Sequence, residues 1–415
     1  MNDLEATMLI DLFPRAHARY TSLPLLSTHL EGFARWLREQ GFSHATIRQR
    51  VLRARALEAD FQRQDVRGLG ELSCAELLRF APPKAKDAKH LSALVRSLTV
   101  YLETQGVLRR PSVSRTQLLV GTYRDHLTQV RGYAHRTAGN HAALARELLG
   151  FLRFEDNPDA LRTLGPPQLE AFLKAAAARQ GRAALRNTAA RLRSLLRFLT
   201  GQGEAAAGLD ALIDTPPVYR GETLPRALPW ESVRALLAGV DRAATTGRRD
   251  YAMLLLAATY GLRSSEVVGL RLEDFRWRSG EIRVRRPKTG DASLLPLTDE
   301  VGAAIVDYLR NARPASVHRA VFLGIRPPIR PLAPSSLGTA FDKWKRHCEI
   351  DIPCSGAHCL RHSLAMRLLR RDASLEVIGD LLGHRSPAST CAYLRLSADD
   401  LREAALELPA EEERP

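Results

Sequence analysis

The sequence predicts a mainly α-helical protein of several domains, in which two helical bundles precede an α+β domain with a small antiparallel sheet. Three observations support this fold class. The chain has 415 residues, too many for one ordinary domain, so two or three domains are expected. Apolar residues recur every three or four positions through roughly the first half of the chain, the period of an amphipathic helix. Strand-forming residues gather in one short stretch, at about 274 to 296.

The first bundle is expected to contain four helices. Gly41 and Gly106 each follow a helical pattern and are expected to end it. Short connections between such segments are typical of an antiparallel bundle. The expected helices span residues 30–40, 45–62, 75–80 and 91–105.

The second bundle repeats parts of the first. A fixed long period is the mark of a repeated structural unit, so we interpret the first bundle as a duplicate of the second. We expect His44 and His135, which occupy equivalent positions, to lie at helix starts and not to bind a ligand. The matching segments are Gly41, His44 and Thr46 with Gly132, His135 and Thr137, then Arg96-Ser97-Leu98 and Gln105-Gly106 with Arg193-Ser194-Leu195 and Gln202-Gly203.

A change of composition marks the passage to the third domain. After Gly203 the chain turns to Gly, Ala and Glu, and several prolines follow, which is typical of a linker. Helical patterns return over 233–240 and 251–260, and again from Glu300. Between them, strands are expected at 274–276, 281–285 and 293–296. The expected domains are 1–109, 110–206, a linker at 207–222, a third domain at 223–396, and a C-terminal helix with a tail at 397–415.

The charge of the chain favours a polyanionic partner. Lys and Arg number 61 against 46 Asp and Glu, a formal net charge of +15, and nearly all of the positive charge is Arg. Guanidinium groups match phosphate oxygens bidentately. A basic protein without such a partner is the alternative. The arginines that gather on expected helices, and that we interpret as candidate DNA contacts, are Arg48, Arg50, Arg53, Arg136, Arg146, Arg186, Arg193 and Arg197.

We expect a cytoplasmic protein. The N-terminus lacks the basic start and apolar core of a signal peptide, and the longest apolar run, about 251 to 262, is too short to span a bilayer. The five cysteines are odd in number and scattered, which does not suit a disulfide framework. A zinc cluster is the alternative for the set Cys348, Cys354, His358, Cys359 and His362, although the paired spacing of a zinc knuckle is missing.

Residues that could act on a phosphate occur in a fixed order in the third domain. Arg263 and Glu266 come first, in Gly-Leu-Arg-x-x-Glu, and Lys288 follows on an expected hairpin turn in Lys-Thr-Gly. The segment 358–393 then holds the remainder: His358 and Arg361 in His-x-Leu-Arg-His, His384 in Leu-Leu-Gly-His, and Tyr393. Each motif alone is weak, but the ordered set is specific.

This ordered set resembles the catalytic domain of the tyrosine recombinases, the phage integrase and Xer-type family, over roughly residues 223 to 396. The resemblance implies site-specific DNA recombination through a 3′-phosphotyrosine bond formed by Tyr393. It implies that both helical modules are SAM-like DNA-binding bundles, with 110–206 in the place of the core-binding domain. The large recombinases of mobile elements, which act in integration or transposition, have a similar layout.

Physical reasoning supports the roles that the resemblance implies. Arg263, Arg361 and His384 would hold the phosphate, since its equatorial oxygens carry negative charge in the transition state. Lys288 would protonate the leaving 5′ oxygen, with Lys343 or Lys345 as competitors. The phenol of Tyr393 has an ordinary pKa of about 10 and needs a base, for which His358 is the expected acceptor.

Three further expectations concern neighbours of this set. Glu266 would orient Arg263, because residues three apart share a helix face. His362 would pack or form a structural hydrogen bond. No cofactor is expected, since the covalent bond conserves the phosphodiester energy and the sequence lacks a GxxxxGK[ST] loop and an acidic metal cluster.

The expected partners are duplex DNA with specific sites and further copies of the chain. The copies are expected to assemble as a tetramer on DNA, either alone or together with other recombinases. A stripe of apolar residues on the helix 398–408 suits docking on a neighbouring copy, or packing on its own domain. Two other functions remain open: a non-cleaving, architectural DNA-binding factor, and a relaxing topoisomerase of related chemistry. The tandem helical modules disfavour the topoisomerase.

Overall fold

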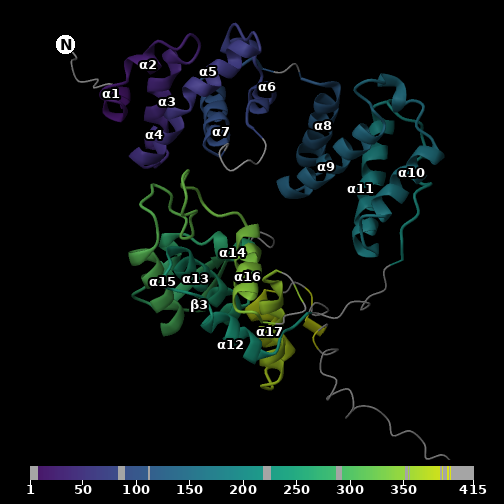
Figure 1. Ribbon diagram of the computed structural model, residues 1–415. Helices are drawn as coiled ribbons and strands as arrows, with labels where there is room; N and C mark the ends of the chain where they lie inside the picture. The colour runs from purple at the N-terminus through teal and green to yellow at the C-terminus, as the bar shows by residue number, and fades with distance from the viewer. Residues whose placement is uncertain are drawn as a thin grey trace, which may run out of the picture. The chain divides into compact units, whose positions relative to one another are not determined.

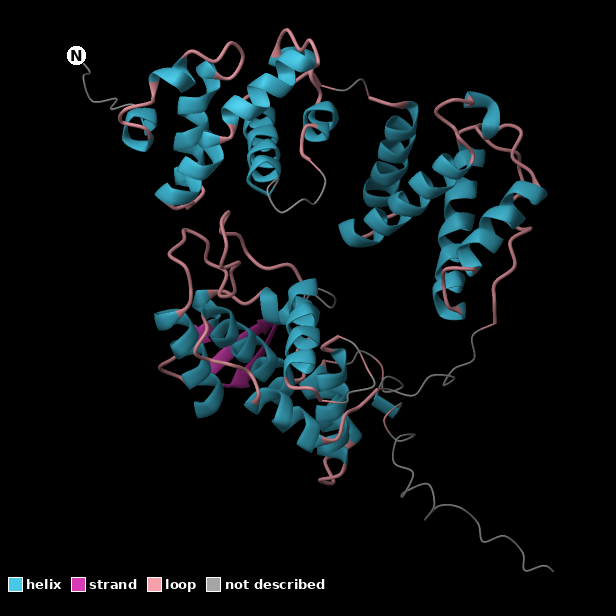
Figure 2. Ribbon diagram, in the orientation of Figure 1, coloured by secondary structure: helices cyan, strands magenta, loops and turns pink. Residues whose placement is uncertain are grey.

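The computed structural model consists of helical bundles and one small sheet (Figures 1 and 2). The chain divides into two compact units, one formed by residues 1–108 with 223–415 and the other by residues 109–222. The described residues are 8–82, 89–110, 113–217, 226–286, 292–350, 354, 356–383, 386, 390, 391 and 393.

The first 108 residues form a helical module with its own apolar core, in which Phe33, Phe61 and Leu98 are fully buried. The buried carboxylate of Glu58 accepts hydrogen bonds from the amides of Leu25 and Leu26 at 2.9 and 3.1 Å, which satisfies donors at the start of a helix. The helices are α1 (Met8–Leu12), α2 (Ala18–Thr21), α3 (Ser27–Glu39), α4 (His44–Leu52), α5 (Ala54–Arg63), the short η1 (Leu69–Glu71), α6 (Cys74–Arg79) and α7 (Lys89–Thr104).

One predicted helix of this module is divided in two. The expected span 45–62 is broken at Arg53, which ends α4 and begins α5. The amide of Arg53 donates to the carbonyl of Arg50, three residues back, at 3.0 Å. This tightened turn interrupts the regular α-helical bonding, in a stretch that contains neither Gly nor Pro.

The unit 109–222 is a second helical bundle, with a core that includes Tyr123, Leu148 and Phe172. The Tyr123 hydroxyl is 3.0 Å from both His141 Nδ1 and Ser194 Oγ, so the polar end of this buried ring is hydrogen-bonded. Its elements are α8 (Arg115–Asp125), the π-helical η3 (His126–Val130), α9 (His135–Phe151), the short η4 (Pro158–Ala160), α10 (Pro166–Ala177) and α11 (Arg182–Gly201).

The two modules end in the same local structure. Gly106 and Gly203 both have positive φ, 69° and 73°. After each glycine, the next amide reaches back to a leucine carbonyl: Val107 to Leu102 at 3.0 Å, and Glu204 to Leu199 at 2.9 Å. These are helix C-caps that need a left-handed residue, and they occur where the sequence repeat aligns Gly106 with Gly203.

The third part, from residue 226, packs helices against a three-stranded antiparallel sheet in the order β1-β2-β3. The register pairs Phe275 with Ile282 and Val284 with Ser293. The three predicted strands and the mainly α-helical fold class are therefore confirmed. The elements are α12 (Trp230–Ala238), α13 (Thr245–Tyr260), α14 (Ser264–Val268), η5 (Leu272–Asp274), β1 (Phe275–Arg276), β2 (Glu281–Arg285), β3 (Ala292–Pro296), α15 (Asp299–Asn311), α16 (Ser335–His347), α17 (His358–Leu369) and α18 (Leu375–Leu382).

The core of this third part is organised around α13, where every residue from Ala252 to Ala258 is buried. Helices α15, α16 and α17 pack against it. In the described part of the chain, no helix has the length and apolarity that a membrane crossing requires. Lys288, His384 and the C-terminal helix expected at 397–415 lie outside the described residues.

Candidate active site

Arg361 lies near the start of α17 and is buried, with 3% of its surface exposed. Its Nη1 donates to the carbonyl of Gly261 at 2.7 Å, and its Nη2 donates to the carbonyl of Leu382. Burial, followed by the nearby positive charge of Arg263, lowers the pKa of Arg361 to about 10. The guanidinium is still charged at neutral pH, and its orientation is fixed by two backbone oxygens.

Arg263 directly precedes α14, and Glu266 of that helix holds it through both backbone and side chain. Glu266 Oε2 accepts from the Arg263 amide at 2.8 Å, and Glu266 Oε1 accepts from Arg263 Nη1 at 2.8 Å. The carboxylate is 3% exposed. Arg263 Nη2 also faces the carbonyl of Gly383 at 3.4 Å. The structure thus brings Arg263 and Arg361 to the same helix end, that of α18.

Tyr393 is 2% exposed and packs in a small apolar cluster with Leu364, Ile378 and Leu382. Its hydroxyl lies 3.0 Å from His362 Nδ1. Burial raises the pKa of Tyr393, while the charges of Arg361 and Arg263 lower it. The phenol is therefore protonated near neutral pH, and it has both an imidazole partner and a positive field at its oxygen.

The two histidines of α17 stand edge to face, with ring centroids 4.6 Å apart. His358, the proton acceptor expected from the sequence, is partly covered, and this desolvation with the charges of Arg361 and Arg263 lowers its pKa. The immediate partner of the Tyr393 hydroxyl is His362, for which the sequence had suggested only a structural role. The spacing of four residues, which sets both imidazoles on one face of a helix, was the available signal.

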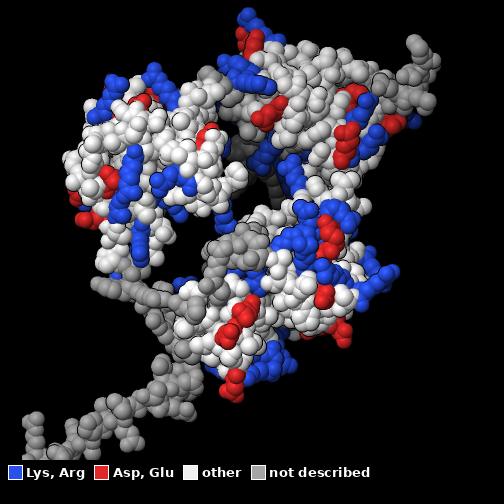
Figure 3. All heavy atoms as spheres, turned by 180° about the vertical axis from the view of Figure 1, so that it is seen from behind, with Lys and Arg blue, Asp and Glu red and all other residues white. Residues whose placement is uncertain are grey.

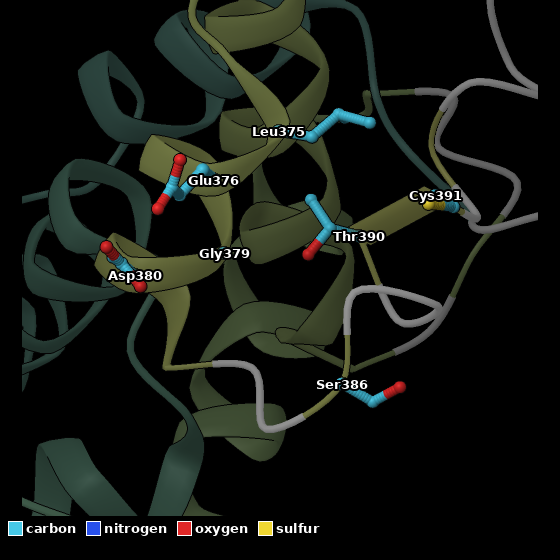
Figure 4. Close-up of a pocket in the computed structure, with 7 residues that line it drawn as sticks. All are labelled: Leu375, Glu376, Gly379, Asp380, Ser386, Thr390 and Cys391. Atoms are coloured by element: carbon cyan, nitrogen blue, oxygen red, sulfur yellow. The ribbon is translucent and has the colours of Figure 1, made fainter.

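The segment that carries Tyr393 rests against α18 around a pocket of about 340 Å³ (Figure 4). A Cβ atom on Gly379 would lie 3.2 Å from Thr390 Oγ1, so this glycine allows a close approach. The Tyr393 amide donates to the Thr390 carbonyl at 3.0 Å. Glu376 and Asp380 also line the pocket, and their negative charge disfavours a phosphate there. We therefore interpret the pocket as part of the packing between α18 and the residues near Tyr393, and not as a phosphate site.

The lysines that could compete with Lys288 are engaged elsewhere. Lys343 Nζ lies 3.4 Å from a carboxylate oxygen of the buried Asp250, and Lys345 Nζ donates to the Cys354 carbonyl at 3.0 Å. In the described part of the chain no three His, Cys, Asp or Glu residues are grouped so that they could hold a metal ion. The five residues considered as a zinc cluster all lie among the described residues, and no three of them are grouped in this way.

The candidate DNA-contact arginines fall into two groups. The first group has partners within the protein: Arg48 donates to the Leu12 carbonyl at 3.1 Å, Arg50 stacks over the Phe42 ring at 4.0 Å, Arg193 donates to the Ile213 carbonyl at 3.1 Å, and Arg197 pairs with Asp210 at 2.7 Å. The second group consists of the exposed Arg53, Arg136, Arg146 and Arg186, although Arg48 and Arg197 of the first group are exposed as well. Figure 3 shows how widely basic side chains are spread over the surface.

Comparison with known proteins identifies relatives of this chain. The phage integrase family matches residues 226–399. A relative from Sinorhizobium fredii, y4rA, whose name assigns it to the integrases and recombinases, is 35% identical over 388 residues, 91% of this chain and 93% of its own length. The tyrosine recombinase XerD of Xanthomonas axonopodis pv. citri is 35% identical over 225 residues, 51% of this chain and 73% of its own length.

Among solved structures, a λ integrase tetramer bound to a Holliday junction matches with a TM-score of 0.52 and 16% sequence identity, covering 72% of this chain and 86% of that one. At this identity the structural match concerns the fold alone. The match to y4rA extends over nearly the full length of both chains at 35% identity. The chain therefore belongs to the phage integrase family and is a tyrosine-type site-specific recombinase.

Proposed function

We propose that this recombinase cuts and rejoins DNA strands through a 3′-phosphotyrosine bond formed by Tyr393. The observation that carries the proposal is the setting of the phenol. Its oxygen lies 3.0 Å from His362 Nδ1, and although burial raises the pKa of Tyr393, the charges of Arg361 and Arg263 act in the opposite direction. An imidazole in contact with the hydroxyl, within the positive field of two arginines, suits attack on a phosphodiester.

In the proposed step, the Tyr393 oxygen forms a bond to phosphorus while the bond from phosphorus to the 5′ oxygen breaks. The phenol proton passes to an imidazole, and the leaving 5′ oxygen receives a proton from an acid. Attack by a 5′ hydroxyl on the phosphotyrosine reverses these transfers and rejoins the strand. The covalent bond conserves the phosphodiester energy, so the reaction needs no ATP.

We assign the phenol proton to His362 in the first instance, because His362 is the imidazole in contact with the Tyr393 hydroxyl. His358 is the second candidate, and its lowered pKa keeps it able to accept a proton near neutral pH. Lys288 as the acid and His384 as a phosphate ligand follow from their motifs in the sequence.

Arg263 and Arg361 would stabilise the negative charge that grows on the phosphate oxygens. A guanidinium has five N–H donors, and among the described residues Arg361 uses two nitrogens for the Gly261 and Leu382 carbonyls. Further donors are left for a phosphate. Since both groups are already oriented by backbone oxygens and by Glu266, little reorganisation would be needed when DNA binds.

Duplex DNA and further copies of this chain are the proposed partners. The solved λ integrase neighbour is a tetramer bound to a Holliday junction, and the exposed arginines of the helical modules suit a phosphate backbone. We propose that both modules bind DNA and that the first arose by duplication of the second, on the basis of the sequence repeat and the equivalent helix ends at Gly106 and Gly203. The C-terminal residues 397–415 would dock on a neighbouring copy.

A nicked suicide duplex, which carries the target site and traps the cleaved state, tests the chemistry. Wild-type protein is expected to form a covalent complex with this DNA, and Tyr393→Phe is expected to bind the DNA without forming one. If both proteins behave alike, the cleavage proposal is refuted. Binding by both without any covalent complex would favour the alternative, a non-cleaving DNA-binding factor.

The DNA contacts of the second module can be tested by removing exposed charge. The triple variant Arg136→Ala, Arg146→Ala and Arg186→Ala is expected to bind DNA more weakly and with a shallower dependence on salt, by about 0.9 in slope for each lost phosphate contact. The control is Arg179→Ala, because Arg179 is an exposed arginine of the same unit paired with Glu147 at 2.5 Å. Equal salt slopes in the triple variant and wild type would contradict the assignment.

A further inference from the structure

Three arginines from distant parts of the sequence donate to three successive carbonyls at the C-terminal end of α18. Arg286 Nη2 donates to the Leu381 carbonyl at 2.9 Å, Arg361 Nη2 to that of Leu382, and Arg263 Nη2 faces that of Gly383 at 3.4 Å. The last carbonyls of a helix have no partner within the helix, and the helix dipole favours positive charge there. Two of these arginines belong to the family motifs, and Arg286 does not.

Arg286 is unusual for its position. It follows β2 directly, and its side chain is 4% exposed although its strand neighbours Arg283 and Arg285 are exposed. A charged side chain is rarely buried without a compensating interaction. The bond to Leu381 joins residues 95 positions apart, so it ties the end of β2 to the end of α18.

Gly383 leaves the space that the Arg286 guanidinium fills. A Cβ atom on Gly383 would lie 1.1 Å from Arg286 Nη1 and 2.2 Å from its Cζ. Gly383 also has φ of 63°, a conformation that favours glycine. The turn after α18 is therefore shaped to hold this guanidinium, and a side chain at Gly383 would expel it.

The two segments joined in this way each continue into a proposed active-site residue. Lys288 comes two residues after Arg286, and His384 directly follows Gly383. The charge of Arg286 also contributes to the lowered pKa of Arg361, which indicates that the two guanidinium groups are close. An arginine at this junction can fix the end of β2, from which the chain continues to Lys288.

We propose that Arg286 is a positioning residue, which anchors the end of β2, from which the chain continues to Lys288, to the end of α18 and so serves the protonation of the leaving 5′ oxygen. The inference rests on the proposed cleavage chemistry. Its consequence is specific to one proton transfer: loss of Arg286 slows cleavage of an ordinary phosphodiester, but matters little when the leaving group needs no proton.

The experiment compares two suicide duplexes, one with the ordinary 5′ oxygen at the scissile phosphate and one with sulfur in its place. A thiolate leaves without protonation, because thiols are far more acidic than alcohols. Single-turnover formation of the covalent complex is measured at saturating DNA for wild type, Arg286→Met and Arg286→Lys. Arg283→Met is the matched control, since it removes an exposed arginine of β2, three residues before Arg286.

Arg286→Met is expected to cleave the oxygen duplex about 10- to 100-fold more slowly, the range typical for loss of a residue that orients a reacting group. On the sulfur duplex it should approach the wild-type rate. Arg286→Lys, which keeps a positive charge and a donor at this position, should recover part of the loss on oxygen. Arg283→Met should cleave both duplexes as wild type does.

An equal loss on both duplexes, or no loss on either, overturns the proposal. Gly383→Ala gives a second approach if Arg286→Met does not fold: it displaces the guanidinium while keeping the charge, and it must show the same selective loss on the oxygen duplex. Failure of the underlying function is distinguished by the wild type, which would then form no covalent complex with either duplex.

Discussion

Replacing Gly261 by alanine tests how tightly the arginine site is packed. Gly261 ends α13 with φ of 64°, and its carbonyl accepts the 2.7 Å bond from Arg361 Nη1. A Cβ atom there would lie 2.4 Å from Leu382 Cδ2 and 3.2 Å from Leu364 Cδ2. Both distances are shorter than ordinary van der Waals contact, so the added methyl must displace the Leu382 side chain and press on that of Leu364.

The magnitude has two parts. A left-handed conformation costs a non-glycine residue about 1–2 kcal/mol, and overpacking of a core costs about 1–3 kcal/mol more. Gly261→Ala is therefore expected to lower the free energy of unfolding by roughly 2–5 kcal/mol. Gly280 provides a matched control, because it has the same φ of 64° but open space where its Cβ would lie. Gly280→Ala should lose only the first part.

Urea denaturation of the full chain measures both losses, and covalent-complex formation on the suicide duplex measures the effect on the site. Gly261→Ala should also slow cleavage, since Leu382 and Gly261 supply the two carbonyls that orient Arg361. Gly280→Ala should cleave as wild type does. Equal losses of stability in the two variants would refute the reasoning, because they share the backbone strain and differ only in the steric contact.

Three further predictions concern single side chains. Glu266→Gln removes the carboxylate that holds Arg263, so it should lower the free energy of unfolding, measured by urea denaturation, by about 1–3 kcal/mol. It should also slow cleavage. An unchanged free energy of unfolding and an unchanged cleavage rate would refute the role of Glu266 in orienting Arg263. Burial raises the pKa of Tyr123 from 10.0 to about 12, so the unfolded chain loses the phenol proton at a lower pH than the folded chain does. The free energy of unfolding should therefore fall as the pH rises from about 9 to about 11. This fall should be about 1 kcal/mol larger in wild type than in Tyr123→Phe. The pKa of His358 is lowered in the folded chain, so the unfolded chain binds this proton first as the pH falls through about 6.5. The free energy of unfolding should therefore decline less steeply on acidification in His358→Asn than in wild type. Equal slopes of this free energy against pH would contradict the prediction.

Local rules made part of the site predictable from the sequence. Arg263 and Glu266 are three residues apart at a helix start, and this spacing alone predicts contact. Helix ends at Gly41 and Gly106 followed from the left-handed conformation that glycine allows, and both residues have positive φ. The strands followed from alternation and turn residues within some twenty positions.

The rest depends on contacts between distant segments, which periodicity does not encode. His362 meets the Tyr393 hydroxyl across 31 positions, and Arg286 meets Leu381 across 95. The basic helices show the same limit in another form. Arg50 belongs to the arginines that the sequence made candidate DNA contacts, yet its guanidinium lies over the Phe42 ring and burial lowers its pKa. A count of charges cannot separate these two uses of arginine.

The end of α18 explains how like charges can be assembled before DNA arrives. Arg263, Arg286 and Arg361 repel one another, and this repulsion contributes to the lowered pKa of Arg361. Three backbone carbonyls and the buried carboxylate of Glu266 oppose that repulsion. Three guanidinium groups against one carboxylate still leave an excess of positive charge. A phosphate that enters would relieve this excess, so binding energy and charge stabilisation would come from the same preorganised groups.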